Sequence, residues 1–209
     1  MRVLIHGINY YPELTGIGKY TGEMAQWLSE KGASVRVVTA PPYYPDWKIG
    51  DGYFASKYTF ENIDGIDVWR CPLWIPNQKA GFNRVLHLLS FAASSFPIML
   101  RQILWKPDIL IVVEPTFFCV PFSLMVAKLS RAKSWLHIQD FEIDAGFKIG
   151  LLSGKILHSI VKHIERFIMK KFDHVSSISG KMIERLINDK IPAEKCVLFP
   201  RSFLRRFDK

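Results

Sequence analysis

The chain has 209 residues, of which 49% are hydrophobic and 22% charged, a composition typical of a globular protein and not of a disordered one. The length suits one generous domain or two small ones. The formal net charge of +9 favours anionic partners, namely nucleic acid, phospholipid headgroups or phosphorylated substrates. No long uninterrupted run of lysine and arginine is present, so nucleic acid is only one of these candidates.

The cysteines and the N-terminus indicate the cellular compartment. Cys71, Cys119 and Cys196 are scattered and have no CxxC spacing, so we expect reduced thiols in place of a disulfide framework or a zinc site. The first residues, MRVLIHGIN, contain a short apolar run with no cleavage-site pattern, which predicts a strand and not a signal peptide. We therefore expect a cytoplasmic protein.

The first forty residues predict a strand, a helix and a second strand. Residues 2–8 form a near-continuous apolar run, as in a sheet that is covered on both faces. A helix is expected over 17–31, because apolar residues recur there at spacings of three and four and Gly32 follows. Residues 34–40 predict the second strand. Together they indicate a βαβ unit with parallel strands and a right-handed crossover.

The middle of the chain continues this alternation. Residues 41–54 form an aromatic, proline-rich loop, and two strand-like runs within 58–73 flank Asp64-Gly65, which is a hairpin signal. The elements expected next are a helix over 83–105, bent or interrupted near Pro97, a strand over 108–114, a helix over 118–130 and a strand over 134–140.

A long helix is expected over 151–172, with an apolar line that contains Ile160, Ile164 and Phe167, while Lys162 and other basic residues face elsewhere. A strand over 174–179, a helix over 180–189 and a strand over 195–200 complete the alternation. The fold class is therefore α/β, a doubly wound, Rossmann-like parallel sheet with a β-hairpin insertion.

Two apolar stretches are candidates for membrane spans. Residues 85–100 are shorter than the roughly 20 residues needed to cross a bilayer, and they include His87 and Pro97. Residues 109–127 are long enough but contain Glu114, whose carboxylate would be costly in the bilayer. Buried strands and helices explain both stretches better. The apolar helix region 82–105, flanked by Arg84 and Arg101, is either a core helix or a surface that docks on an anionic membrane.

A glycine-containing loop precedes the first helix. The spacing Gly16-x-Gly18-x-x-x-Gly22 misses the dinucleotide fingerprint by one residue, and no P-loop sequence occurs. Free N–H groups at a helix N-terminus, with Lys19 in the first turn, favour a phosphate. The alternative is that the glycines only permit a tight turn and close packing of the helix.

The segment YYPELTGIGKYTGEMAQWLSEKGASVRVVTAPP resembles the N-terminal half of GT-B glycosyltransferases of family 4. Further similar segments follow in the family's order: IDGIDVWRCP, PDILIVVEP, HIQDFEID and HIERFIMKKFDHVSSISGKMIERLI. The resemblance covers residues 1 to about 200, and HIQDFE is most similar to members that build colanic-acid-type exopolysaccharides. Thr15 and Ser34 depart from the family pattern, so the loop geometry can differ from its norm.

The resemblance implies a substrate class. The donor would be a nucleotide sugar whose diphosphate is bound at Gly16, Gly18 and Lys19, and the acceptor a lipid-linked or oligosaccharide hydroxyl. It implies no cofactor and no nucleic-acid partner. Peripheral contact at the inner face of the cytoplasmic membrane is the remaining partner expectation.

Candidate catalytic residues follow the predicted strand over 134–140. His137 and Asp140 stand where open α/β sheets bind ligands, and the resemblance implies that a polar residue here contacts the donor sugar. The alternative for Asp140 is a carboxylate that caps a loop or helix. Asp140, Glu142 and Asp144 alternate and could bind Mg²⁺, but the family generally works without a metal and we expect none. Glu114 either borders the acceptor cleft or merely ends its strand.

The C-terminal region departs from the family. The resembled enzymes are about twice as long, and their second domain has an E-x₇-E pattern that no pair of glutamates here matches. We expect residues 1–200 to be the acceptor-side domain, with 201–209 a basic tail foreign to the family. The chain would be the N-terminal half of a glycosyltransferase, truncated and inactive alone. The alternative is a non-enzymatic basic α/β module that docks on a membrane or a partner chain.

Overall fold

A computed structural model describes residues 1–78, 81–114, 117–140 and 155–199. Within these ranges an eight-stranded sheet has the order β3-β4-β2-β1-β5-β6-β7-β8, and all neighbours are parallel except β3 and β4. The strands are β1 Arg2–His6, β2 Ser34–Thr39, β3 Thr59–Ile63, β4 Ile66–Arg70, β5 Ile109–Glu114, β6 Lys133–Ile138, β7 His174–Ser177 and β8 Cys196–Leu198. The predicted doubly wound sheet is confirmed.

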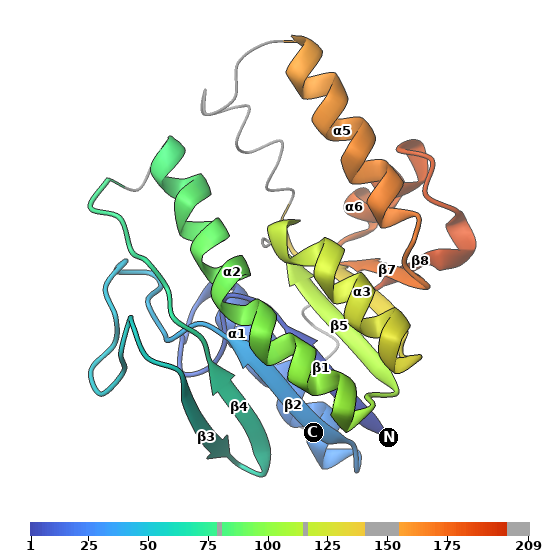
Figure 1. The fold of residues 1–209 in the computed structure, drawn as a ribbon. Helices are drawn as coiled ribbons and strands as arrows, with labels where there is room; N and C mark the ends of the chain where they lie inside the picture. Colours follow the sequence, from blue (N-terminus) through green and yellow to red (C-terminus); the bar gives the residue numbers. More distant parts are fainter. Residues whose placement is uncertain (79–80, 115–116, 141–154, 200–209) are drawn as a thin grey trace.

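Helices cover both faces of this sheet. They are α1 Gly16–Glu30, α2 Phe82–Trp105, α3 Val120–Ser130, α5 Lys155–Met169 and α6 Gly180–Asn188, with short 3₁₀ turns at Phe117–Cys119 and Ala193–Lys195. Buried side chains of α1 pack with one face of the sheet, and those of α2, α3 and α6 pack with the other. Figure 1 shows α2 and α3 side by side across that second face.

The predicted hairpin is confirmed at β3 and β4. Ile63 pairs with Ile66, and Asp64 and Gly65 form the turn with φ angles of 50° and 82°. Two consecutive left-handed residues match the twist of the flanking strands, which is why Asp-Gly is favoured here. Because β4 pairs with β2, the hairpin extends the sheet at one edge.

The sequence predicts that the helix is bent or interrupted near Pro97, and the structure shows that it is not interrupted. α2 runs as one helix from Phe82 to Trp105 and includes Pro97. Proline removes one backbone hydrogen bond, which leaves the carbonyl of Ala93 without its usual donor. Both residues are on the exposed side of α2, so water can hydrogen-bond this carbonyl and the helix continues.

The expected orientation of α5 is also wrong. Ile160, Ile164 and Phe167 are 51%, 45% and 58% exposed, whereas Lys162 and Glu165 are buried. The Lys162 Nζ lies 2.9 Å from Glu165 Oε2, one helical turn apart, and burial raises the pKa of Glu165 while the lysine acts in the opposite direction. A buried pair is tolerated when each charge has the other as partner.

His6 connects the end of β1 to two helices. Its Nδ1 lies 2.8 Å from Ser123 Oγ and its Nε2 lies 3.1 Å from Ser95 Oγ. Each serine hydroxyl also lies near a carbonyl of its own helix, Ser123 at 2.9 Å from the Cys119 oxygen and Ser95 at 3.3 Å from the Ala92 oxygen, and each has one proton to donate. Complete burial lowers the pKa of His6 from 6.5 to about 3, which keeps the ring neutral.

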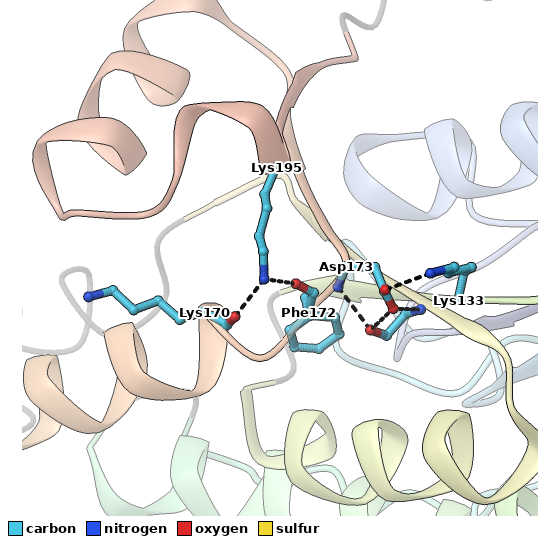
Figure 2. A network of polar contacts seen from close by, with 6 residues as sticks. Lys133, Lys170, Phe172, Asp173 and Lys195 are labelled. Carbon is cyan, nitrogen blue, oxygen red and sulfur yellow. Dashed lines mark hydrogen bonds and ion pairs between the residues drawn. The ribbon is translucent and has the colours of Figure 1, made fainter.

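A polar network holds the amino-terminal ends of β6, β7 and β8 (Figure 2). Asp173 Oδ2 accepts from the Ser134 amide and hydroxyl, both at 2.9 Å, and Asp173 Oδ1 lies 3.1 Å from Lys133 Nζ. Lys195 Nζ donates to the carbonyls of Lys170 and Phe172 at 2.9 and 2.8 Å. These bonds tie the segment after α5 to the sheet.

Candidate functional site

A hollow of about 210 Å³ lies at the carboxyl-terminal ends of the parallel strands. We call it the carboxyl-end hollow. It is bordered by Ile8 and Asn9 after β1, Gly16 and Ile17 in α1, Tyr43, Tyr44 and Trp47 after β2, Arg84, His87 and Leu88 in α2, and Asp140 after β6. Open α/β sheets bind ligands at this edge, where loops from several strands meet.

Gly16 brings the start of α1 to the hollow. Its φ of +60° is a left-handed conformation that glycine adopts without strain, and a Cβ here would lie 3.4 Å from the Tyr44 ring. The preceding residue, Thr15, is extended and its side chain makes no capping bond to α1. Thr15 therefore leaves the first N–H groups of α1 uncapped, and N–H groups at a helix N-terminus bind anions well.

The other two residues of the predicted phosphate loop lie elsewhere. Gly18 is buried, and a Cβ there would lie 2.4 Å from Glu13 Oε2, so this glycine makes room for Glu13. Lys19 Nζ lies 3.9 Å from Glu23 Oε1 on the same helix, and Lys19 borders a different hollow together with Gly22. Only Gly16 of the three borders the carboxyl-end hollow.

Glu13 joins two of the loops that form the hollow. Its Oε1 accepts from the amides of Tyr43 and Tyr44, both at 3.0 Å, and its Oε2 accepts from Asn9 Nδ2 at 2.9 Å. Burial raises the pKa of Glu13, and these hydrogen bonds act against that rise. The loop after β2 is thus fixed to the loop after β1. Sequence reasoning missed Glu13, although a carboxylate within a Pro- and Gly-containing loop was a signal.

Arg70 fixes the same loops from the end of β4. Its side chain is 1% exposed, and its Nε lies 2.6 Å from Glu61 Oε1. The guanidinium also donates to the carbonyls of Ala40 and Tyr11. Tyr10 lies beside it, with 5.6 Å between ring centroid and guanidinium carbon. A buried arginine with these partners positions backbone, and it too was missed from sequence.

His87 borders the hollow from α2 and is 1% exposed. Its Nδ1 lies 2.7 Å from the Trp74 carbonyl and must donate to it, so in the neutral ring Nε2 is an acceptor. Burial lowers the pKa of His87, Arg84 lowers it further, and the bond to Trp74 raises it. Within the described ranges Nε2 has no hydrogen-bond partner. The sequence predicted no site role for His87, which was noted only as a polar residue within the apolar stretch 85–100.

The two predicted catalytic residues do not meet. Asp140 is exposed and borders the carboxyl-end hollow with Gly16. His137 is buried on the α1 face of the sheet, where its Nδ1 lies 2.8 Å from Ser176 Oγ and its ring meets Phe199 edge-on at 5.5 Å. It borders a separate hollow of about 260 Å³ beside α1. β6 ends at Ile138, so His137 is still within the strand, whereas Asp140 lies in the bend that follows it, and the two side chains border different hollows.

Glu114 and the metal ligands complete the predicted set. Glu114 is 1% exposed at the end of β5 and is not among the residues that border the carboxyl-end hollow. Glu142 and Asp144, the other candidate ligands beside Asp140, lie outside the described residues, as does the segment 201–209. Among the residues that the structure describes, no cluster of three or more His, Cys, Asp or Glu side chains could bind a metal ion.

Comparison with solved structures shows what the fold is similar to. The catalytic domain of starch synthase IV from Arabidopsis thaliana, bound to ADP and acarbose, matches with a TM-score of 0.63 and 14% identity, over 96% of this chain and 51% of that one. Apo UGT2 from Phytolacca americana matches with a TM-score of 0.53 and 11% identity, over 96% and 51%. At these identities the likeness shows a shared GT-B fold and nothing of the reaction.

A curated relative is much closer in sequence. The chain is 48% identical over 212 residues to the "Putative colanic acid biosynthesis glycosyl transferase WcaI" of Escherichia coli (strain K12). The match takes in 99% of this chain and 52% of the relative, so the chain spans about half the length of the protein it resembles. The family model described as "Glycosyl transferase 4-like domain" matches residues 15–202. The chain therefore belongs to the glycosyl transferase 4-like family.

Proposed function

We propose that this chain is the acceptor-side domain of a glycosyltransferase that transfers a sugar from a nucleotide-sugar donor to a saccharide acceptor in exopolysaccharide synthesis. Family membership and the 48% identical relative named for colanic acid biosynthesis support the reaction class. The observation that carries the proposal is that Gly16 and Asp140, which are far apart in the sequence, border one hollow.

In this proposal the N–H groups at the start of α1, which Thr15 does not cap, bind the donor's diphosphate, because the positive end of a helix dipole stabilises charge on a leaving phosphate. Asp140 contacts the reacting sugar or its acceptor hydroxyl. A second polypeptide segment, of the kind that makes up the other half of the relative, supplies the remainder of the donor site. The 209-residue chain alone is then expected to bind substrates and transfer little.

The test is sugar transfer by the 209-residue chain, alone and fused to the C-terminal half of the Escherichia coli relative. Radiolabelled nucleotide sugars are supplied with bacterial membranes as the acceptor source. We expect transfer only from the fusion. Asp140→Asn in the fusion should lower kcat roughly 100-fold or more, as removal of a group that acts at the reacting atoms does.

The matched control is Asp51→Asn, since Asp51 is an exposed carboxylate that does not border the carboxyl-end hollow. It should leave kcat unchanged. Absence of transfer from every fusion, with each protein folded by circular dichroism, would contradict the proposed reaction. Full activity in the Asp140→Asn fusion would contradict the role of Asp140 alone.

We further propose that the acceptor is lipid-linked and that the exposed side of α2 contacts the inner face of the cytoplasmic membrane. α2 is the one helix of the described residues that is long and apolar enough to span a bilayer, with a mean hydropathy of 1.2 and 39% of that window buried. Its partial burial in the fold favours surface contact over spanning. Phe82 and Leu104 are 71% and 86% exposed, and apolar side chains on such a face insert at the headgroup boundary.

Vesicle sedimentation tests this contact. The chain should sediment with anionic phosphatidylglycerol vesicles and less with neutral phosphatidylcholine vesicles, because basic residues such as Arg101 flank the face. The double variant Phe82→Glu/Leu104→Glu should abolish sedimentation, while Ile187→Glu, at an exposed apolar position on α6, should not. Sedimentation of the double variant with the wild type would refute membrane contact by α2. Membrane binding without any transfer by the fusion would favour a non-enzymatic docking module.

A further inference from the structure

A buried carboxylate joins the segments that form one side of the carboxyl-end hollow. Glu13 is 4% exposed. Its Oε1 accepts from the amides of Tyr43 and Tyr44 in the loop after β2, and its Oε2 accepts from Asn9 Nδ2 in the loop after β1. Asn9, Tyr43 and Tyr44 border the hollow, whereas Glu13 itself does not. The carboxylate therefore holds three wall residues in place from behind the wall.

The start of α1 packs against the same carboxylate. A Cβ on Gly18 would lie 2.4 Å from Glu13 Oε2, so only a glycine backbone fits beside this oxygen. The two loop amides use both lone pairs of Oε1, and Oε2 has Asn9 Nδ2 and Gly18 as neighbours. The hydrogen bonds of the carboxylate in the described residues thus all come from N–H donors, and little space is left for a proton.

Protonation of Glu13 would disturb this arrangement. Hydrogen bonds to an ionised acceptor are roughly twice as strong as those to a neutral one, so all three bonds would weaken. The O–H of a protonated carboxyl also needs an acceptor. Asn9 can supply one only if its side-chain amide turns its oxygen toward Glu13. Uptake of one proton therefore loosens the two loops or reorients a residue that borders the hollow.

The charges around Glu13 come from several elements. Burial has the largest effect and raises the pKa of Glu13, while the Arg70 guanidinium at the end of β4 lowers it. That guanidinium is also paired with Glu61 on β3 at 2.6 Å. The other titratable residues that border the two neighbouring hollows beside Glu13 are Tyr10, Tyr11, Lys19, Glu23, Asp64, Asp46, Lys48, Asp51 and Tyr53. The carboxyl therefore takes up its proton at a higher pH than an exposed glutamate does.

We propose that Glu13 is a positioning residue whose ionised form holds the hollow in its binding shape, and that one proton on this carboxyl loosens the loops after β1 and β2. Glu13 acts through Asn9, Tyr43 and Tyr44, since it does not border the hollow itself. Substrate affinity should therefore fall as pH falls. The effect on a nucleotide-sugar substrate rests on the proposed function; the proton-dependent position of the loops does not.

NMR of the ¹³C,¹⁵N-labelled 209-residue chain tests the proton dependence without a ligand. The pH is lowered from 8 toward 4 for as long as circular dichroism shows a folded chain. The backbone amides of Tyr43 and Tyr44 and the side-chain amide of Asn9 should shift in one common transition, centred above 4.5, the ordinary pKa of a glutamate. The ¹³C resonance of the Glu13 carboxyl should follow the same transition, a result that does not depend on any variant folding.

Variants at positions 13 and 9 assign the transition. Glu13→Gln keeps the size of the side chain and removes its titration, so the amides of Tyr43 and Tyr44 should no longer shift with pH. Adding Asn9→Asp to Glu13→Gln returns one carboxylate to the contact between the two positions and should restore a transition. The matched control is Asp51→Asn, because Asp51 is an exposed carboxylate in the same loop as Tyr43 and Tyr44. Its removal should leave the transition unchanged.

The effect on the substrate is measured with the fusion to the C-terminal half of the Escherichia coli relative. Its KM for the radiolabelled nucleotide sugar should rise about tenfold from the high-pH to the low-pH side of the transition, the size of one hydrogen bond. In the Glu13→Gln fusion the higher KM should be present at every pH. Glu13→Gln should change kcat less than KM, because the residue does not contact the reacting atoms.

The proposal is overturned if the three amides and the Glu13 carboxyl do not share one transition, or if folded Glu13→Gln shows the same transition as the wild type. It fails separately from the proposed function. A transition that depends on Glu13, without transfer by any fusion, would leave the positioning of the loops and remove the reaction. Transfer by the fusion with a KM that does not follow the transition would leave the reaction and remove the control by Glu13.

Discussion

The two ends of the sheet differ in how their polar groups are used. At the amino-terminal end, the Lys195 ammonium and the Asp173 carboxylate are directed to named partners in neighbouring segments (Figure 2). At the carboxyl-terminal end, His87 has an acceptor without a partner in the described residues, and Asp140 is exposed. At the amino-terminal end, polar side chains hold neighbouring segments of the chain together. At the carboxyl-terminal end, His87 Nε2 and the exposed Asp140 do not have this role.

The carboxyl-terminal end of the sheet also has buried side chains that hold its loops in place. Glu13 and Arg70 are almost fully buried and bind backbone groups of the loops that border it. Ligand groups at a site keep their geometry only when supporting residues hold the loops. The comparison therefore predicts that substitutions at this end alter stability and binding together, while those at the amino end alter stability alone.

The largest effect is expected on acidification, through His6 at the end of β1. Its pKa is about 3 in the folded chain and 6.5 in the unfolded one, so between these values the unfolded state binds one proton more. Stability should therefore fall as pH falls through this window, by about 1.4 kcal/mol per pH unit from this group. Urea unfolding between pH 7 and 4 measures the slope.

His6→Asn removes the titrating ring and should flatten that slope, whereas the exposed control His163→Asn should not. Glu13 and Glu165 have raised pKa values and act in the opposite direction, since their folded carboxyls take up protons first as pH falls. The difference between wild type and His6→Asn removes their common contribution. Equal slopes in both proteins would show that His6 does not control the acid response.

An effect of comparable size is expected from Arg70→Met. The change leaves Glu61 and the carbonyls of Ala40 and Tyr11 without their donor, and should cost about 3–5 kcal/mol of unfolding free energy. The affinity for the proposed nucleotide-sugar donor should fall as well, because the loops that border the hollow lose their support. Unfolding in urea and calorimetric binding measure the two. A stable Arg70→Met protein with wild-type affinity would mean that the hollow does not depend on these buried side chains.

How much of this could be predicted from sequence depends on the range of the interactions. The strands and the hairpin were predictable, since continuous apolar runs and Asp64-Gly65 are local signals. The hollow's aromatic wall also lay in a recognisable place, the proline-rich loop after the second strand. Glu13 and His87 were not predictable, because their roles depend on partners such as Tyr43 and Trp74, which no local pattern identifies.

The structure separates two of the predicted site residues and reverses the expected orientation of one helix, and each difference from the sequence prediction has a physical cause. Asp140 and His137 were both predicted as catalytic candidates near the end of one strand, but β6 ends at Ile138, so Asp140 lies in the bend beyond it while His137 remains buried within it. The orientation of α5 was inferred from hydropathy, which treats Lys162 and Glu165 as surface residues because it ignores that one can neutralise the other. Apolar periodicity therefore located the helix correctly but not its buried face.

A smaller effect is expected from Gly18→Ala, which tests the fit between α1 and Glu13. A Cβ at this position would lie 2.7 Å from Glu13 Cβ and 2.4 Å from its Oε2, so the carboxylate must shift. We expect a loss of about 1–3 kcal/mol, the usual range for overpacking, with weaker ligand binding. Thermal unfolding and calorimetry provide the measurements.

Gly180→Ala is the matched control, because Gly180 is also a helical glycine but a Cβ there would have no atom within 4 Å among the described residues. Alanine there should be neutral or stabilising by up to about 1 kcal/mol through helix propensity. If Gly18→Ala behaved like Gly180→Ala, the close contact with Glu13 would not constrain position 18.

The smallest effects are expected at the amino-terminal end of the sheet, where two lysines allow a comparison between hydrogen bonds to backbone carbonyls and an exposed ion pair. Lys195→Met removes two hydrogen bonds to carbonyls from a half-buried residue and should cost about 1–2 kcal/mol, whereas Lys133→Met removes an ion pair whose lysine is 71% exposed and should cost less than about 1 kcal/mol. Neither should change the affinity for the proposed nucleotide-sugar donor, because neither residue borders the carboxyl-end hollow. Urea unfolding ranks the two variants. A loss of affinity in Lys195→Met would mean that the two ends of the sheet are coupled through β7 and β8. The amino-terminal end would then affect ligand binding as well as stability.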